Sequence, residues 1–115
     1  MKKVKTLKKN YEFKNVIKKG KYYIKKYIIV YITENKKNEN FIGIAVNTKL
    51  CNAVKRNKIK RLIRESYYKQ KTKIKKGYNI VFLLNKKTSI ENISFKEVNE
   101  EIQEIFKDAE IFNEN

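Results

Sequence analysis

The side chains with the most specific binding chemistry in this chain are its three arginines. Arg56, Arg61 and Arg64 lie within nine residues, whereas every other basic residue in the sequence is a lysine. A planar guanidinium can donate two parallel hydrogen bonds to a phosphate or to a base edge. The clustering of all the arginines therefore predicts a surface that binds a polyanion, and it favours RNA.

Further polar side chains surround these arginines. The additional residues expected to contact RNA are Lys55, Asn57, Lys58, Lys60 and Lys69, together with Lys49 in the preceding segment. The Asn57 amide could bind a base edge or a ribose 2′-hydroxyl. The alternative is a solvated basic face of an amphipathic helix, and the concentration of every arginine in one segment argues against it.

A helix over residues 53–70 would position these side chains. At 100° per residue, Ile59, Leu62, Ile63 and Ser66 fall on one narrow face, while the arginines at 61 and 64 fall on the opposite one. The helix should therefore bury its apolar face and present its cations to solvent.

The charge of the whole chain supports a polyanionic partner. The 115 residues carry a formal charge of +17. Residues 91–115 hold eight acids and two lysines, a charge of −6, which leaves +23 for residues 1–90. Like charges repel and destabilise a compact state, so such an excess points to a bound polyanion. A codon bias toward AT-rich codons explains why most basic residues are lysines. It does not explain why basic residues outnumber acidic ones. A membrane surface is a weaker alternative to RNA as the polyanionic partner.

Aromatic side chains form a second candidate site. Residues 22–33 hold Tyr22, Tyr23, Tyr27 and Tyr31 and read as one long strand that bends near residues 25–26 or splits in two. Tyr23, Tyr27 and Tyr31 would share a face. With Phe13 on a preceding helix they could stack unpaired bases. Packing in the core is the alternative, and the sequence leaves the two open.

Catalytic chemistry is not evident in the sequence. There is no histidine, and Cys51 is the only cysteine, so a His/Cys metal site, a histidine triad and an internal disulfide are excluded. No acid/base pair stands out, and Cys51 lacks a partner for nucleophilic catalysis. No apolar run is long enough to span a membrane. We expect no catalytic residue, a cytoplasmic location, and neither a membrane nor DNA as a partner.

The remaining elements define one α+β domain of residues 1–115. We expect a helix at 10–20, strands at 22–33 and 41–46, a strand at 78–84, and a last helix with a capping box of Ser94 and Glu97. The order is α-β-β-(β)-α-β-α, with a small mixed sheet of about four strands packed by helices. Residues 1–9 read as a basic arm and 107–115 as an acidic tail, both frayed.

Residues 52–65 closely resemble the signature of the bacterial ribonuclease P protein subunit. That signature runs Ala-Val-x-Arg-Asn-Arg-x-Lys-Arg-x-x-Arg, and the chain departs from it only at Lys58. The resemblance extends over residues 7–106 and includes Lys19-Gly20, Gly43-Ile44-Ala45-Val46 and Gly77-Tyr78-Asn79-Ile80-Val81. Further departures are Phe41, Cys51 and the loop at residues 47–49.

The resemblance implies a subunit of an endoribonuclease whose RNA performs a magnesium-dependent removal of the 5′ leader from precursor tRNA, with the magnesium held mainly by RNA. It implies a left-handed β-α-β crossover around the basic helix, against the general right-handed preference. By matched position, Arg56, Asn57, Lys58, Lys60, Arg61 and Arg64 would contact the catalytic RNA. The residues that would line a cleft for the leader are Phe13, Val16, Ile17, Ile28 and Tyr31.

Two other functions remain open at this point. A small basic ribosomal RNA-binding protein would share the charge pattern without a preference for a leader. A free-standing nuclease would need an acid/base pair that the sequence does not reveal.

Overall fold

The computed structural model describes residues 4–49, 51–86 and 93–113. They form a four-stranded mixed sheet packed by helices, which confirms the predicted fold class and element order. The elements are α1 (Asn10–Lys19), β1 (Lys21–Ile24), β2 (Ile28–Glu34), β3 (Phe41–Ala45), α2 (Ala53–Gln70), β4 (Tyr78–Leu84) and α3 (Phe95–Asp108).

The strands lie in the order β1-β2-β4-β3. β2 is antiparallel to both β1 and β4, while β3 and β4 run parallel and are joined through α2. This connection is the β-α-β crossover to which the resemblance assigns a left-handed sense. β4 lies inside the sheet, and its residues Ile80, Val81 and Phe82 are fully buried on the two faces. That burial explains its continuous apolar sequence.

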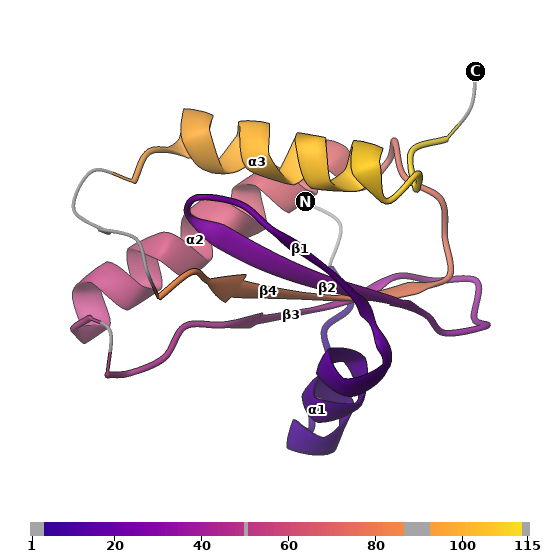
Figure 1. The fold of residues 1–115 in the computed structure, drawn as a ribbon, viewed down its shortest axis with the longest axis horizontal. Coiled ribbons are helices and arrows are strands. Elements are labelled where there is room, and N and C mark those ends of the chain that lie inside the picture. The colour runs from indigo at the N-terminus through magenta and orange to yellow at the C-terminus, as the bar shows by residue number, and fades with distance from the viewer. Residues whose placement is uncertain (1–3, 50, 87–92, 114–115) are drawn as a thin grey trace.

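Helices cover the two faces of the sheet unequally. α2 and α3 lie together on one face, and α1 lies alone on the other (Figure 1). The larger core, which includes Ile63, Phe82 and Phe106, fills the space under α2 and α3. The smaller cluster under α1 has Val16 and Val81 at its centre. The α1 face therefore leaves more of its apolar surface accessible.

Of the two possibilities that the sequence left open for residues 22–33, one bent strand or two strands, the structure shows two. The segment is a hairpin of β1 and β2 in which Tyr22 pairs with Tyr31, and the Lys25 backbone N–H donates to the Ile28 carbonyl at 2.9 Å. Tyr27 is buried in the larger core, so the predicted common face of Tyr23, Tyr27 and Tyr31 is wrong. The turn interrupts the alternation of side chains, and Tyr31 faces α1 with Tyr22 instead.

Residues 4–9 of the predicted N-terminal arm lie against the sheet. Thr6 forms a parallel bridge with Ile42, and the Leu7 backbone N–H donates to the Ile42 carbonyl at 2.8 Å. Leu7 itself is buried in the smaller cluster. The arm therefore extends the β3 edge of the sheet rather than fraying, and residues 1–3 of the predicted arm lie outside the described residues.

Residues 107–113 of the predicted acidic tail pack against the body of the domain in the structure. Ile111 is 2% exposed, and Phe112 forms an antiparallel bridge with Ile74. The Asn113 backbone N–H donates to the Lys73 carbonyl at 2.7 Å. Burial of Ile111 thus fastens the segment after α3 to the loop that follows α2. Residues 114–115 lie outside the described residues.

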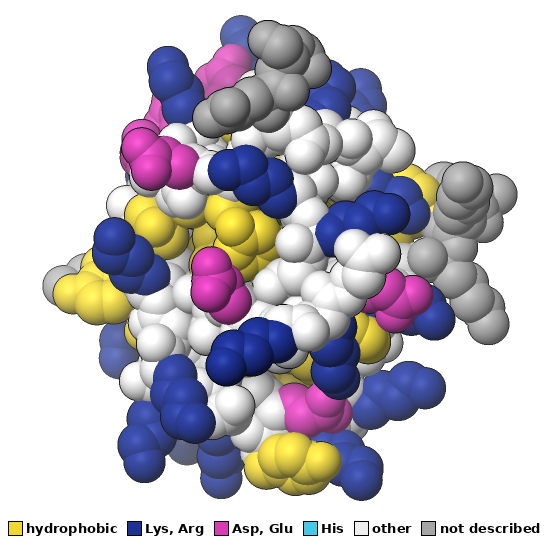
Figure 2. Space-filling view, turned by 90° about the vertical axis from the view of Figure 1, so that its right-hand side faces the viewer, with side chains coloured by type: hydrophobic (Ala, Val, Ile, Leu, Met, Phe, Trp, Pro, Cys, Tyr) yellow, Lys and Arg dark blue, Asp and Glu magenta, His cyan; other side chains and the backbone are white. Residues whose placement is uncertain are grey.

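Positive charge reaches the end of the molecule that carries the β2–β3 turn. In a view onto that end, dark-blue lysine and arginine side chains predominate over the scattered magenta acids (Figure 2). The cations of the chain are thus not confined to α2.

Candidate RNA interface

The start of α2 is defined by an asparagine cap directly before the basic segment. The Asn52 Oδ1 atom accepts a hydrogen bond from the Lys55 backbone N–H at 2.9 Å. Ile59 and Ile63 are buried, which confirms the predicted apolar face, and Tyr67 extends that face by one turn. Burial of these residues fixes the rotation of α2 about its own axis. The opposite face must then point to solvent.

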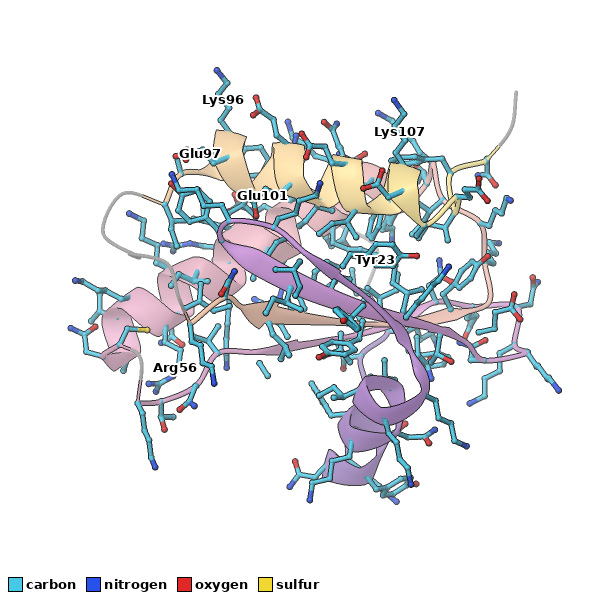
Figure 3. The ribbon with its side chains drawn as sticks, viewed as in Figure 1. Tyr23, Arg56, Lys96, Glu97, Glu101 and Lys107 are labelled. Atoms are coloured by element: carbon cyan, nitrogen blue, oxygen red, sulfur yellow. The ribbon has the colours of Figure 1, made fainter. Side chains whose placement is uncertain are left out.

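That solvent-facing side carries the predicted RNA contacts. Lys55, Asn57, Lys58, Arg61, Arg64 and Lys69 are exposed, whereas Arg56 and Lys60 are half-buried. Among the described residues, the ion pairs involve Lys5 and Lys25, and none involves a cation of α2. The arginine and lysine charges of α2 are therefore free to neutralise phosphates. Figure 3 shows Arg56 projecting from the start of α2, on the side away from α3.

The loop before α2 places one more predicted contact nearby. Lys49 is exposed, and its backbone N–H donates to the Asn47 side-chain carbonyl at 2.9 Å. Cys51, which replaces the usual glycine of the resemblance, is half-buried and packs against the larger core. The loop thus directs the Lys49 charge to solvent close to the start of α2.

A partly exposed apolar surface lies beside α1, where the resemblance predicts the leader groove. Phe13 and Tyr31 are half-buried and pack around the fully buried Val16. The Tyr22 and Tyr31 rings lie 5.8 Å apart, with Tyr22 60% exposed, and Ile17 is 38% exposed. These rings offer flat apolar surfaces on which unpaired bases could stack. Of the predicted cleft residues, Phe13, Ile17 and Tyr31 are accessible here, while Val16 supports them from below.

Ile28 does not belong to this groove. It is fully buried in the larger core, on the sheet face covered by α2 and α3. Its position on β2 has the same parity as Val30 and Ile32, whereas Tyr31 has the opposite parity. Tyr22 takes the place that the sequence prediction gave to Ile28. The alternation of side chains along β2 alone separates Ile28 from Tyr31.

Gly43 on β3 allows Phe13 to lie directly on the sheet. A Cβ atom at Gly43 would overlap the Phe13 ring. No side chain fits there, so the aromatic ring rests against the strand backbone. The glycine therefore allows the close approach of α1 to β3.

The groove residue Phe13 and the cations of α2 meet in a hollow at the β3 edge. This β3-edge hollow has a volume of about 320 Å³, and Phe13, Gly43, Lys60, Arg64 and Tyr68 contribute to its lining. Val4, Thr6, Leu7, Ile42 and Ile44 complete the lining. The hollow combines two aromatic rings with two cations. Such a combination suits a nucleotide, because the rings can contact the base while the cations contact a phosphate.

One residue of this interface, Tyr68, escaped the sequence analysis. Tyr68 lies four residues after Arg64 and eight after Lys60, so helical periodicity alone could have placed it on the same side of α2. Tyr22 belongs to the predicted aromatic set, and the hairpin register places it beside Tyr31. Phe41, a departure from the resemblance, is half-buried beside the smaller cluster, and the Lys37 Nζ atom lies 5.1 Å from its ring.

Within residues 4–49, 51–86 and 93–113, no group of three or more acidic, histidine or cysteine side chains could hold a metal ion. In the same ranges, no helix is long and apolar enough to cross a membrane. The side chains of the interface thus offer positive charge and aromatic surface rather than metal ligands.

The chain matches known proteins over nearly its whole length. The sequence model of the family described as Ribonuclease P matches residues 1–110. A protein of Clostridioides difficile named "Ribonuclease P protein component" is 38% identical over 108 residues, 93% of either chain. A protein of the same name from Clostridium botulinum is 36% identical over 108 residues, 93% of this chain and 96% of the relative.

Solved structures with the same fold carry the same name. The ribonuclease P protein of Staphylococcus aureus superposes with a TM-score of 0.83 at 32% identity, covering 96% of this chain and all of the other. The ribonuclease P protein of Thermotoga maritima gives a TM-score of 0.80 at 32% identity, covering 90% of this chain and 96% of the other. Sequence and fold therefore point to the same relatives.

Proposed function

Because the chain belongs to the ribonuclease P protein component family, we propose that it holds both the catalytic RNA and the 5′ leader of precursor tRNA. Ribonuclease P is an endoribonuclease whose RNA subunit is catalytic, and this chain is its protein component. The cations of α2 bind the catalytic RNA, and the α1 groove binds the single-stranded leader. No residue of the protein takes part in bond cleavage.

The β3-edge hollow is the observation that carries this proposal. Phe13 comes from the leader groove, while Lys60 and Arg64 come from the catalytic-RNA face, and all three line the same hollow. An RNA strand that leaves the groove would meet these two cations at once. The protein can therefore hold the leader and the catalytic RNA against each other.

The cations contribute mainly by neutralising phosphates. Each lysine or arginine that contacts the RNA backbone releases condensed counterions and lowers the repulsion between RNA segments. We assign magnesium to RNA phosphates, because the donor set of the described interface does not fit a chain-held ion. The expected consequence is that the RNA reaches its active geometry at a lower magnesium concentration when the protein is bound.

The test measures substrate preference in the reconstituted holoenzyme. We expect tighter binding of leader-bearing precursor tRNA than of mature tRNA, and Phe13→Ala should reduce this preference by about 5- to 100-fold, the range for loss of one stacked base. Phe95→Ala is the matched control, since Phe95 is also half-buried but lies on α3. Equal affinity of the wild type for both tRNAs would refute the leader groove.

A further inference from the structure

Two buried polar side chains of α2 meet one side chain of α3. Ser66 is fully buried and Gln70 is 2% exposed, and they are the buried polar residues of the part of the chain that the structure describes. The Ser66 hydroxyl donates to the Asn99 Oδ1 atom at 2.8 Å, and the Gln70 Nε2 atom donates to the same oxygen at 3.2 Å. Ser66 and Gln70 lie four residues apart on α2, so both reach one acceptor. These three residues form the Asn99 network.

The Asn99 network is a poor device for stability. The Gln70 Oε1 atom is buried and has no hydrogen-bond partner among the described residues. A buried acceptor without a donor lowers stability, and apolar side chains of similar size at a buried polar site are often equally or more stabilising. Proteins break the rule of polar satisfaction mainly at functional sites. A role other than stability therefore explains the network better.

Hydrogen bonds fix a helix position that apolar contacts leave adjustable. Ile63 of α2 and Ile102 of α3 belong to the larger core. Their burial is favourable in many relative positions of the two helices, because the hydrophobic effect has no direction. The two bonds to Asn99, by contrast, form only when α2 has one rotation and one height against α3. The network thus sets where the solvent-facing side of α2 lies.

α3 is a fixed support for the Asn99 network. The Phe106 ring of α3 lies 6.4 Å from the Phe82 ring of β4. The preceding residue of β4, Val81, lies on the other face of the sheet and packs with Val16 of α1. Figure 1 shows the sheet between these helices, with α2 and α3 on one face and α1 on the other. Contacts therefore run from Asn99 through α3 and β4 to the side of the sheet that carries the leader groove.

The position of α2 matters most at the β3-edge hollow. Lys60 and Arg64 line this hollow from α2, and Phe13 lines it from α1. Ser66 lies two residues after Arg64 on the same helix, so a shift or rotation of α2 moves both cations relative to the Phe13 ring. Groups that bind one ligand together must keep their spacing to within about 0.5 Å. An RNA strand that contacts the ring and the cations at once is therefore sensitive to the network.

We propose that Asn99 is a positioning residue for precursor tRNA. Through Ser66 and Gln70 it holds the cations of α2 at the distance from the leader groove at which one RNA strand contacts both. This inference rests on the proposed function, and it makes α3 a contributor to substrate recognition that touches no RNA. Binding of the catalytic RNA alone depends on the cations of α2, and the network changes neither their number nor their exposure.

The test replaces the network by apolar side chains. Ser66→Ala/Gln70→Met/Asn99→Leu should keep the melting temperature at or above that of the wild type, because the unpaired Gln70 acceptor disappears with the two bonds. In the holoenzyme reconstituted with a ribonuclease P RNA, the preference for leader-bearing over mature tRNA should fall about tenfold, less than the roughly 100-fold that a misplacement of about 1 Å can cost. The affinity for that RNA alone and its salt dependence should not change, since every cation of α2 remains.

Two further variants separate positioning from a general effect of substitution. Asn99→Asp keeps an oxygen acceptor for both donors and should keep the leader preference of the wild type. Gln103→Leu exchanges an exposed amide of α3, four residues after Asn99, and should change none of the measured quantities. If the triple variant does not fold, Ser66→Ala takes its place. It removes the shorter of the two bonds and should lower the leader preference in the same direction by a smaller factor.

Four outcomes would overturn the positioning role. A melting temperature that falls together with the leader preference would show that the network only stabilises the fold. An equal loss of affinity for the catalytic RNA alone would place the effect in RNA binding by α2. An unchanged leader preference in the folded variant would show that the network positions nothing, while the proposed function stands. Equal affinity of the wild type for the two tRNAs would refute the proposed function and this inference with it.

Discussion

Helices α2 and α3 pack side by side on one face of the sheet, yet they use charge in opposite ways. On α3, the Glu101 carboxylate accepts hydrogen bonds from the backbone N–H groups of Tyr27 and Ile28 at 3.1 to 3.2 Å. Glu104 and Asp108 pair with Lys25 of the same hairpin. Figure 3 shows Glu101 pointing from α3 toward the hairpin. The cations of α2 have no such partners among the described residues.

The contacts of the α3 acids with the hairpin shift the pKa values of two of their carboxyl groups. Burial raises the pKa of Glu101, although its hydrogen bonds from Tyr27 and Ile28 act in the opposite direction. The Tyr27 hydroxyl donates to Glu97 and lowers the pKa of that carboxyl. The acids of α3 thus hold the β1–β2 hairpin against the helix. Negative charge on α3 therefore stabilises the fold, whereas positive charge on α2 is left for a partner.

Charge reversal should lower the affinity for the catalytic RNA strongly on α2 and little on α3. Arg61→Glu/Arg64→Glu should weaken binding of the catalytic RNA by about 100-fold or more, because two phosphate contacts become repulsive. The melting temperature should stay near that of the wild type, since both side chains are exposed. Lys96→Glu/Lys107→Glu makes the same change in charge on α3. An equal loss of affinity in that control would show that only net charge matters.

Removal of the hairpin anchor should affect stability instead of binding. Glu101→Ala leaves the Tyr27 and Ile28 N–H groups without their acceptor and should lower the free energy of unfolding by about 2 kcal/mol. Glu100→Ala, one residue away and exposed, should change it by less than about 0.5 kcal/mol. Denaturant unfolding measures both. Similar losses in the two variants would contradict the anchoring role.

The smallest expected effect is a change with pH. The pKa of Glu101 is raised in the folded state, so the folded protein binds this proton more tightly than the unfolded chain does. The wild type should therefore gain stability relative to Glu101→Gln as the pH falls through the folded pKa, and lose it as the pH rises. Melting temperatures of both proteins between pH 7 and pH 4 measure this difference. A difference that moves the other way would rule out desolvation as the dominant cause.

Regular periodicity made part of the fold predictable. The bounds predicted for α2 and β4 agree with the structure, because a long amphipathic pattern and a continuous apolar run both persist over many residues. The sequence left open whether residues 22–33 form one bent strand or two, because residues 25–27 contain neither glycine nor proline and the flanking residues all favour strands. The misplacement of Ile28 has a different source. Its place in the cleft came from matched position in the resemblance, although the alternation of side chains along one strand already sets it opposite Tyr31.

The sequence alone determined the cationic face of α2, the absence of histidine chemistry and the resemblance to the ribonuclease P protein subunit. These properties depend on residue types at short, regular spacings. Only the tertiary structure decided that Phe13 meets Lys60 and Arg64, and that Asn99 accepts hydrogen bonds from Ser66 and Gln70. Those residues come from separate segments, and the burial of apolar side chains in two unequal cores brings the segments together.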